Sequence, residues 1–266
     1  MAYRMSIPVS VLVCARNEAR CLARCLSSLS NFAEVVLIDS RSTDETCAIA
    51  ESFGARVVHF DWTGQYPKKR QWCLDQLSLA HEWIFFVDAD EVITPALAAE
   101  IARVMQSPAH EGYFVAGLYV MDGRVLQHGL HNNKLVLFKR QAFHFPVVDD
   151  LSIPGMGEME GHYQPLPRPE SNQDAPSTVR IGALTQPLWH YAYQSGENWQ
   201  SRHQRYATWE AGMNARKAWP ADPDPRRETL KRLFRALPCR GVIAFIHSYI
   251  YKGGFLDGAA GLALAR

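Results

Sequence analysis

Several motifs that would assign a function at once are missing from this sequence of 266 residues. No G-x-G-x-x-G follows the first apolar run and no G-x-x-x-x-G-K-[ST] occurs, so neither a dinucleotide-binding fingerprint nor a P-loop is supported. No serine lies in G-x-S-x-G, which argues against an α/β-hydrolase triad. The six cysteines include no C-x-x-C pair, which favours reduced, mostly buried thiols over a zinc site.

The sequence also lacks an excess of one charge and a long apolar run. Twenty-eight Lys and Arg against 27 Asp and Glu give a net charge of +1, so we expect no nucleic-acid partner. Residues 1–6 do not resemble a secretory signal, and we expect a cytoplasmic chain. The most apolar stretch, residues 241–265, is interrupted by His247, Lys252 and Asp257, so we expect no transmembrane span of about 20 residues there.

What is present is an alternation of strand-length and helix-period segments through the first 110 residues. Strands are expected at residues 9–14, 34–39, 56–60 and 83–88. The intervening helices include one that begins at Pro67 and one capped by Thr94. This pattern predicts an α/β fold with a mostly parallel, Rossmann-like sheet and helices on both faces. Further strands are expected at residues 113–121 and 134–139, a loop at 146–187 and a helix over 188–216.

Ligands bind beyond the carboxyl ends of such strands, and polar residues gather there. Asp88-Ala89-Asp90 ends the run WIFFV, and two carboxylates spaced in this way can converge on a divalent cation. Asp39 ends the run VVLI, where it can accept a hydrogen bond from a nucleobase or ribose. Lys68, Lys69 and Arg70 place positive charge at a predicted helix start, which suits a diphosphate.

A general base and a second binding surface are expected further along the chain. Four carboxylates in loop-like, glycine-rich sequence are candidates for the base, and the residues alone do not choose among Asp149, Asp150, Glu158 and Glu160. Aromatic and basic side chains beyond them suit a sugar or a phosphate-bearing acceptor. The candidates for acceptor contact are His162, His190, Arg202, Arg205 and Trp209.

Four motifs follow one another along the chain: VSVLVCARNEARCLARCLSSL, VVLIDSRSTDET, KKRQWCLDQ and WIFFVDADE. Together they resemble the family 2 inverting glycosyltransferases of the GT-A fold, and especially bacterial enzymes of lipopolysaccharide-core and exopolysaccharide synthesis. The resemblance implies sugar transfer from a nucleotide-diphosphate sugar, with UDP-sugar the expected donor, and a Mn²⁺ or Mg²⁺ cofactor. It places Asp90 on the metal and Asp88 near the ribose, while the D-x-D spacing keeps Asp88 as a second candidate metal ligand. The nucleotide-binding residues that it implies, together with the strand-end positions, are Ala15, Arg16, Glu18, Asp39, Lys68, Lys69, Arg70, Asp88 and Ala89.

Two departures from the family pattern affect the assignment. The first strand ends CARNE instead of P-x-[YF]-N-E, and the acid pair that supplies the family's base is not plainly present. Glu160 ranks first as its replacement and Asp150 second. A sugar-nucleotide-forming nucleotidyltransferase and a non-catalytic, membrane-associated nucleotide-sugar-binding protein are the alternatives, and the first would show a glycine-rich loop where this chain has CARNEAR.

The division of the chain follows from these assignments. Residues 1–225 are expected to form the GT-A domain, with a nucleotide-binding half at 1–110 and an acceptor half at 111–225. Residues 226–266 carry about eight basic and two acidic groups among apolar residues. This composition predicts a helical segment that binds an anionic membrane surface, peripherally on the cytoplasmic face of the inner membrane, where a lipid-linked saccharide acceptor lies.

Overall fold

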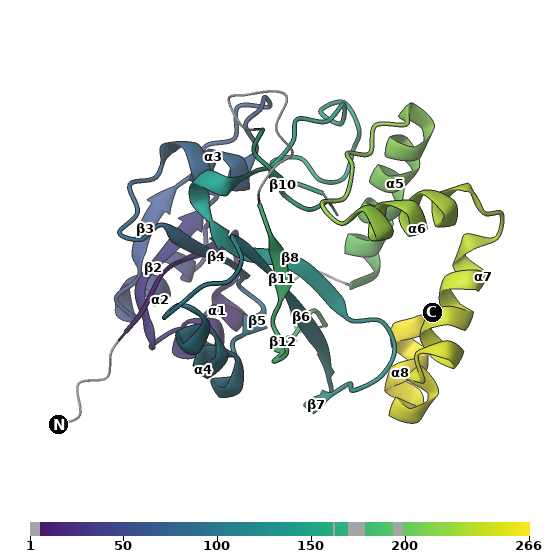
Figure 1. Ribbon diagram of the computed structural model, residues 1–266, viewed down its shortest axis with the longest axis horizontal. Coiled ribbons are helices and arrows are strands. Elements are labelled where there is room, and N and C mark those ends of the chain that lie inside the picture. Colours follow the sequence, from purple (N-terminus) through teal and green to yellow (C-terminus); the bar gives the residue numbers. More distant parts are fainter. Residues whose placement is uncertain (1–5, 162, 170–178, 194–198) are drawn as a thin grey trace.

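The computed structural model describes residues 6–161, 163–169, 179–193 and 199–266. Its first half contains four parallel strands in the order β3-β2-β1-β4 (Figure 1). They agree with the predicted strands to within two residues at either end. Their bounds are β1 (Ile7–Ala15), β2 (Phe32–Asp39), β3 (Arg56–His59) and β4 (Trp83–Asp88). The pairing Ala15 with Asp39 and Cys14 with Asp88 brings their carboxyl ends to one edge.

Four helices connect and follow these strands: α1 (Ala19–Ser27), α2 (Thr46–Ser52), α3 (Lys69–Gln76) and α4 (Pro95–Val104). The strand order runs one way from β1 to β3 and then returns past β1 to β4. With right-handed crossovers, this reversal puts α3 on the opposite face from α1 and α2 and opens a ligand crevice beside β1. The predicted α/β architecture, with helices on both faces, is confirmed.

The second half extends the sheet with mixed pairing. The long strands β6 (Gly112–Met121) and β8 (Asn132–Lys139) run antiparallel, and β8 pairs with β4. The remaining short strands are β5 (Glu91–Val92), β7 (Arg124–Val125), β9 (Phe143–His144), β10 (Leu166–Pro167), β11 (Ile181–Ala183) and β12 (Leu188–His190), and a 3₁₀ turn spans Arg140–Ala142.

Two boundaries predicted from the sequence are wrong. The helix expected from residue 188 is a strand at its start, because β12 pairs with both β6 and β5, and α5 (Trp199–Arg216) begins only later. Pro67 is not the first residue of α3, which begins at Lys69. Carboxylate oxygens of Glu160 accept the N–H groups of the first turn, so a distant residue sets where this helix starts.

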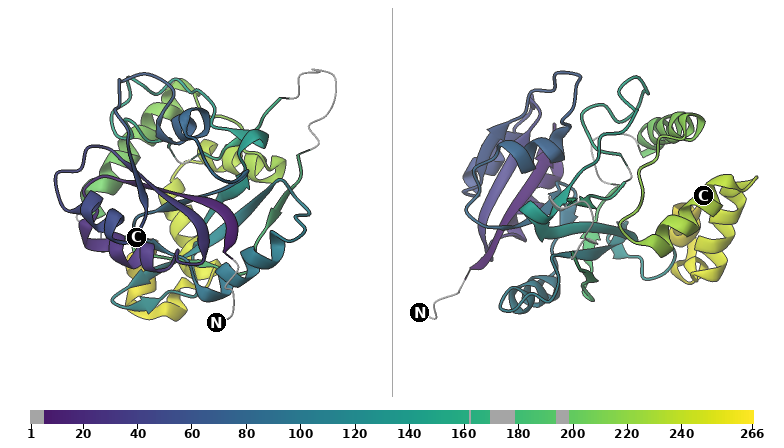
Figure 2. Two further views of the ribbon diagram at one scale, coloured as in Figure 1. Left: turned by 90° about the vertical axis from the view of Figure 1, so that its left-hand side faces the viewer. Right: turned by 45° about the horizontal axis from the view of Figure 1, so that its top comes forward.

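The C-terminal part is helical and lies beside the sheet (Figures 1 and 2). It comprises α6 (Pro225–Ala236), α7 (Arg240–Phe245), a π-helical segment (Ile246–Tyr251), a 3₁₀ segment (Gly254–Asp257) and α8 (Gly258–Ala265). Asp257 fastens it to the main body by accepting hydrogen bonds from the N–H groups of Gln127 and His128. Within the described residues, no helix combines the length and apolar character needed to cross a bilayer.

Candidate functional site

The first Asp of the D-x-D triplet is held between two cations. Arg70 Nη2 lies 3.0 Å from Asp88 Oδ1, and Lys134 Nζ lies 2.8 Å from Asp88 Oδ2. Burial by itself would raise the pKa of Asp88, but Lys134 and Arg70 outweigh it and hold the pKa far below its usual range. Asp88 is therefore ionised, and its orientation is fixed from β8 and α3 together.

The second Asp of the triplet, Asp90, lies close to a histidine from β12 and an arginine from α5. Asp90 Oδ1 lies 3.4 Å from His190 Nε2, and Asp90 Oδ2 lies 3.7 Å from Arg202 Nη1. The ring of Tyr119 stacks on His190 at 5.2 Å. Carboxylate oxygen and imidazole nitrogen are a donor set that suits Mn²⁺ and related divalent ions. Asp90 and His190 thus fit the expected metal, and the structure places His190 here, beside the triplet.

Three buried donors in this region have no hydrogen-bond partner within the described part of the chain: Arg70 Nε, Arg202 Nε and His190 Nδ1. Leaving a buried donor unsatisfied costs about 1–3 kcal/mol, so three of them at one place indicate that a ligand, an ion or water satisfies them. Two of the three belong to guanidinium groups, whose planar forks match phosphate oxygens. The arrangement can therefore receive an anion next to the carboxylates of Asp88 and Asp90.

The Asp39 side chain is buried at the end of β2 and accepts hydrogen bonds from the Ser42 N–H and from His59 Nδ1, the latter at 3.1 Å. Burial would raise its pKa, but hydrogen bonds with Ser42, Cys47 and His59 lower it below the usual value. The carboxylate is therefore ionised where sequence analysis expects a nucleobase.

The loops that follow β1 and β2 are joined by hydrogen bonds. Asn17 adopts a positive φ of 56° and its Oδ1 accepts from the Thr43 N–H, while the Glu18 N–H donates to Thr46 Oγ1. Arg16 is exposed and Glu18 is half-buried beside this junction. Burial raises the pKa of Glu18, and Asp90 raises it further. The expected nucleotide-binding positions after β1 and β2 thus share one connected surface.

The three cations at the start of α3 do not act as one cluster. Lys68 and Lys69 are almost fully buried, and each is paired with a carboxylate, Lys68 with Asp150 at 2.6 Å and Lys69 with Glu158 at 2.7 Å. Arg70 alone of the three reaches the D-x-D triplet. The two lysines therefore balance the buried Asp150 and the partly buried Glu158, and Arg70 is the cation positioned for a diphosphate.

The four candidate bases have different surroundings. Glu160 accepts from the backbone N–H groups of Arg70 and Gln71 at 3.0 and 2.9 Å, and burial raises its pKa. The Asp150 carboxylate is almost fully buried and accepts hydrogen bonds from the side chains of Tyr66, Lys68 and Trp209. Glu158 pairs with Lys69, and exposed Asp149 pairs with Arg216. Glu160 and Asp150 therefore hold structure around the site, whatever else they do.

Four of the five expected acceptor residues lie in two places. His190 and Arg202 lie at the D-x-D triplet, as described above. Trp209 is fully buried, its ring packs so closely on Gly161 that a Cβ there would come within 2.2 Å, and exposed Arg205 lies one turn earlier on α5. His162 lies outside the described residues.

Two site residues, Lys134 and Glu91, were not predicted from the sequence. Lys134 bridges Asp88 and the fully buried Glu91, with Nζ 2.6 Å from Glu91 Oε1. A lysine directly before the apolar run LVLF was the available signal, because a buried strand rarely begins with an unpaired cation.

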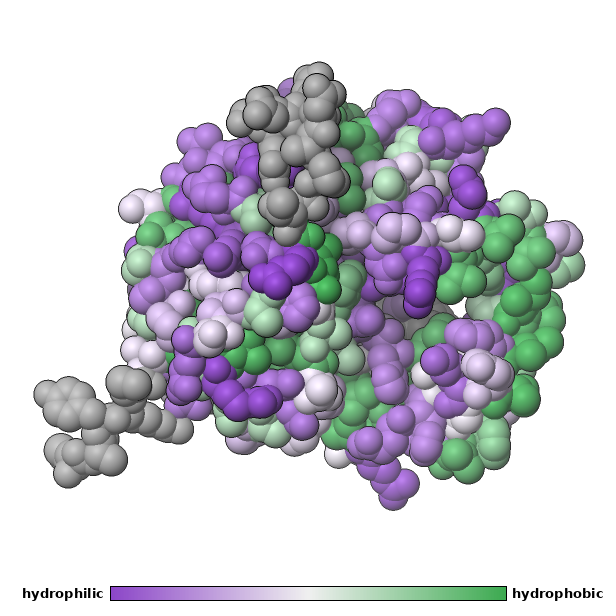
Figure 3. Space-filling model, viewed as in Figure 1, coloured by the Kyte–Doolittle hydropathy of each residue, from purple (hydrophilic) through white to green (hydrophobic). Residues whose placement is uncertain are grey.

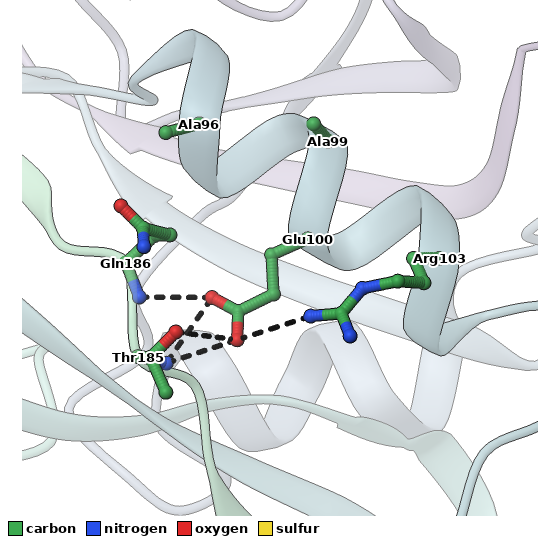
Figure 4. A pocket seen from close by; sticks show the side chains of 6 residues that line it. All are labelled: Ala96, Ala99, Glu100, Arg103, Thr185 and Gln186. Atoms are coloured by element: carbon green, nitrogen blue, oxygen red, sulfur yellow. Dashed lines mark hydrogen bonds and ion pairs between the residues drawn. The ribbon is translucent and has the colours of Figure 1, made fainter.

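A separate pocket lies against α4 and is lined by residues outside this site (Figure 4). Its central carboxylate, Glu100, accepts from the N–H groups of Thr185 and Gln186. That side chain is therefore committed to fixing the loop that leads into β12.

Comparison with known proteins gives a family match. The model for glycosyl transferase family 2 matches residues 10–157. An uncharacterized glycosyltransferase of Rickettsia felis is 35% identical over 106 residues, covering 40% of this chain and 36% of that protein. The lipopolysaccharide core biosynthesis glycosyltransferase LpsC of Rhizobium meliloti is 36% identical over 96 residues, covering 34% of each. The matches thus span about a third of the length of these curated relatives.

Among solved structures, glucosyl-3-phosphoglycerate synthase from Mycobacterium tuberculosis, in complex with Mn²⁺ and uridine-diphosphate-glucose, is similar with a TM-score of 0.33 and 23% identity. The match covers 42% of this chain and 43% of that one.

Proposed function

This chain belongs to glycosyl transferase family 2, and from that premise we propose that it is a metal-dependent inverting glycosyltransferase. It moves a sugar from a nucleotide-diphosphate sugar, with uridine the expected base, to a hydroxyl of a glycolipid or lipid-linked saccharide. The observation that carries this proposal is the D-x-D site, where ionised Asp88 and Asp90 lie beside buried Arg70, Arg202 and His190 donors that await acceptors. The Asp90 carboxylate for a cation and guanidinium groups for phosphate oxygens match a nucleotide diphosphate.

Each strand end has its own part in this mechanism. Asp39, ionised at the end of β2, accepts a hydrogen bond from the base, and Asp88 accepts one from a ribose hydroxyl. Arg70 and Arg202 donate to the diphosphate and stabilise the charge that it acquires on leaving. Asp90 and His190 would hold Mn²⁺ or Mg²⁺, which when bound supplies further stabilisation of that charge.

Glu160, the first candidate for the general base, also fixes the start of α3. Its carboxylate holds the first turn of α3, and Arg70 projects from that turn to Asp88. Inversion needs a base on the face of the sugar opposite the diphosphate, and the backbone contacts of Glu160 direct both oxygens toward α3. We infer that its main contribution is to hold Arg70 in place.

Membrane attachment forms the other part of the proposal. Of the fifteen exposed large apolar side chains in the described residues, eleven fall between Leu230 and Leu256. Figure 3 shows this apolar surface along the C-terminal helices. Basic residues lie within the same segment, among them exposed Arg226 and Arg232. Exposed apolar and basic side chains together suit the cytoplasmic face of an anionic membrane, where a lipid-linked acceptor is found.

A donor screen tests the central proposal. Thermal unfolding is measured with uridine, guanosine and thymidine diphosphate sugars in the presence of Mn²⁺. At 100 times its dissociation constant, the correct donor stabilises the protein by about 2.7 kcal/mol, which raises the Tm by roughly 5–10 °C. Asp39→Ala should lose this rise and keep the unliganded Tm within a few degrees. If no diphosphate sugar raises the Tm, the donor assignment is wrong.

A further inference from the structure

Close to the proposed base-binding carboxylate lies a group of three potential metal ligands. Asp39 ends β2, His59 ends β3 and Cys47 lies in the first turn of α2. Asp39 and His59 are direct partners in the register of the two strands. One ligand atom from each of the three residues lies within 4.8 Å of the others.

The distances are already close to those of a coordinated ion. His59 Nδ1 lies 3.1 Å from Asp39 Oδ2, and Cys47 Sγ lies within 4.8 Å of a ligand atom of each. Zinc bonds to nitrogen and oxygen are about 2.0–2.1 Å long, so two such ligands on a tetrahedral ion lie roughly 3.3 Å apart. An ion can therefore replace the hydrogen bond between Asp39 and His59, and rotation of the Cys47 side chain can bring its sulfur to the same ion.

The donor types select the metal. Sulfur, imidazole nitrogen and carboxylate oxygen form a mixed set that Zn²⁺ prefers, whereas Mg²⁺ and Mn²⁺ favour sites without sulfur, such as the one at Asp90. His59 has a side-chain exposure of 48%, which leaves the cluster open to an ion from solvent.

We propose that Asp39, Cys47 and His59 form a second metal site, which binds Zn²⁺ and competes with the nucleoside for Asp39. The metal-binding part stands on the cluster alone, and the competition rests on the proposed function. Because three protein ligands leave a fourth position, a water completes the tetrahedron. Zn²⁺ bound here lowers donor affinity, while Mn²⁺ or Mg²⁺ at the D-x-D site supports transfer.

Cobalt is the probe for the metal-binding part, because Co²⁺ accepts the same ligands and a cobalt–thiolate bond gives a near-ultraviolet charge-transfer band. The full chain, titrated with Co²⁺ in excess Mg²⁺, should develop this band at one equivalent, and Zn²⁺ should abolish it. Cys47→Ser should remove the band, and His59→Ala should weaken Co²⁺ binding by about tenfold or more. Cys239→Ser is the matched control, since that exposed thiol lies on the C-terminal segment, and its band should be intact.

Competition is measured by calorimetric titration of UDP in Mg²⁺, with and without Zn²⁺. The wild-type protein should bind UDP at least tenfold more weakly with Zn²⁺, and Cys47→Ser should bind UDP equally in both. No band in the wild type, or a band that persists in Cys47→Ser, overturns the metal site. UDP binding unaffected by Zn²⁺ overturns the competition. If UDP binds to no form of the protein, the donor assignment fails, and the cobalt titration still decides the metal site.

Discussion

At the carboxyl edge of the sheet, charged side chains are buried and paired, whereas the segment from Leu230 to Leu256 exposes large apolar side chains. Lys68 is 1% exposed and bound to Asp150, while Leu233 is 60% exposed. Burying a charge costs free energy unless a partner satisfies it. Exposing apolar side chains to water is unfavourable as well, and a large exposed apolar patch often marks a binding surface. In the first region the charged groups are satisfied apart from the donors that await a ligand, and in the second we propose that a membrane covers the exposed apolar side chains.

This contrast separates the effects of substitutions. At the sheet edge each charged group holds another, so a change there should alter turnover or folding. On the C-terminal segment an apolar side chain contributes little to folding, and its removal should alter association only. The following predictions test whether the two regions behave so differently.

The largest effect is expected from Asp90→Ala, which removes one of the two ligands proposed for the catalytic metal. Transfer should fall by at least about 10³-fold, because metal stabilisation of the leaving diphosphate is worth several kcal/mol. A radiolabelled-sugar transfer assay with Mn²⁺ measures this, and Asp122→Asn, on an exposed turn, serves as the control. Turnover within twofold of the wild type would remove Asp90 from the metal site.

Next in size is the stability loss from Asp150→Ala. The substitution leaves the buried Lys68 ammonium, the Tyr66 hydroxyl and the Trp209 indole N–H without their common acceptor. Breaking a buried pair in this way costs about 3 kcal/mol in the free energy of unfolding. Urea denaturation measures the change. Asp149→Ala is the matched control, since Asp149 is next to Asp150 in the sequence but its carboxylate is exposed. Equal stability of the two variants would contradict the structural role.

Glu160→Gln should have a smaller effect that distinguishes positioning from proton transfer. A glutamine amide offers one acceptor oxygen to the two N–H groups of α3, so Arg70 shifts and the KM for the donor rises about tenfold, near 1.4 kcal/mol. Steady-state kinetics with varied donor and acceptor separate KM from kcat. A loss of kcat beyond about 10²-fold with unchanged donor KM would instead identify Glu160 as the base.

What could be predicted from the sequence follows from how local each signal is. The strand ends that deliver Asp39 and Asp88 were found because apolar runs stop at carboxylates, and this pattern lies within a few residues. The partners were not found in the same way. Lys134 is 46 residues from Asp88 and Glu160 is 90 residues from Arg70, and only the folded sheet brings them together.

The same reasoning explains β12 and His190. Residues 188–190 carry no alternation long enough to indicate a strand, and their conformation comes from neighbours on both sides, β6 and β5. As a result, the sequence grouped His190 with the aromatic residues of α5, while the structure puts it beside Asp90. Cys47 and His59 likewise come from different elements, so their proximity to Asp39 could be seen only in the fold.

The smallest effect on the protein itself is expected in the C-terminal segment. Leu233→Ser and Ile246→Ser each remove apolar area that inserts into a bilayer, about 1.4 kcal/mol and hence roughly tenfold in vesicle affinity. Sedimentation with phosphatidylglycerol vesicles at low salt measures binding, and urea denaturation should show nearly unchanged stability. Phe53→Ser, an exposed apolar side chain on the other half of the molecule, is the control and should bind vesicles normally. If wild-type protein fails to sediment, or if the two variants unfold more easily while still binding, these side chains are structural and the membrane proposal is wrong.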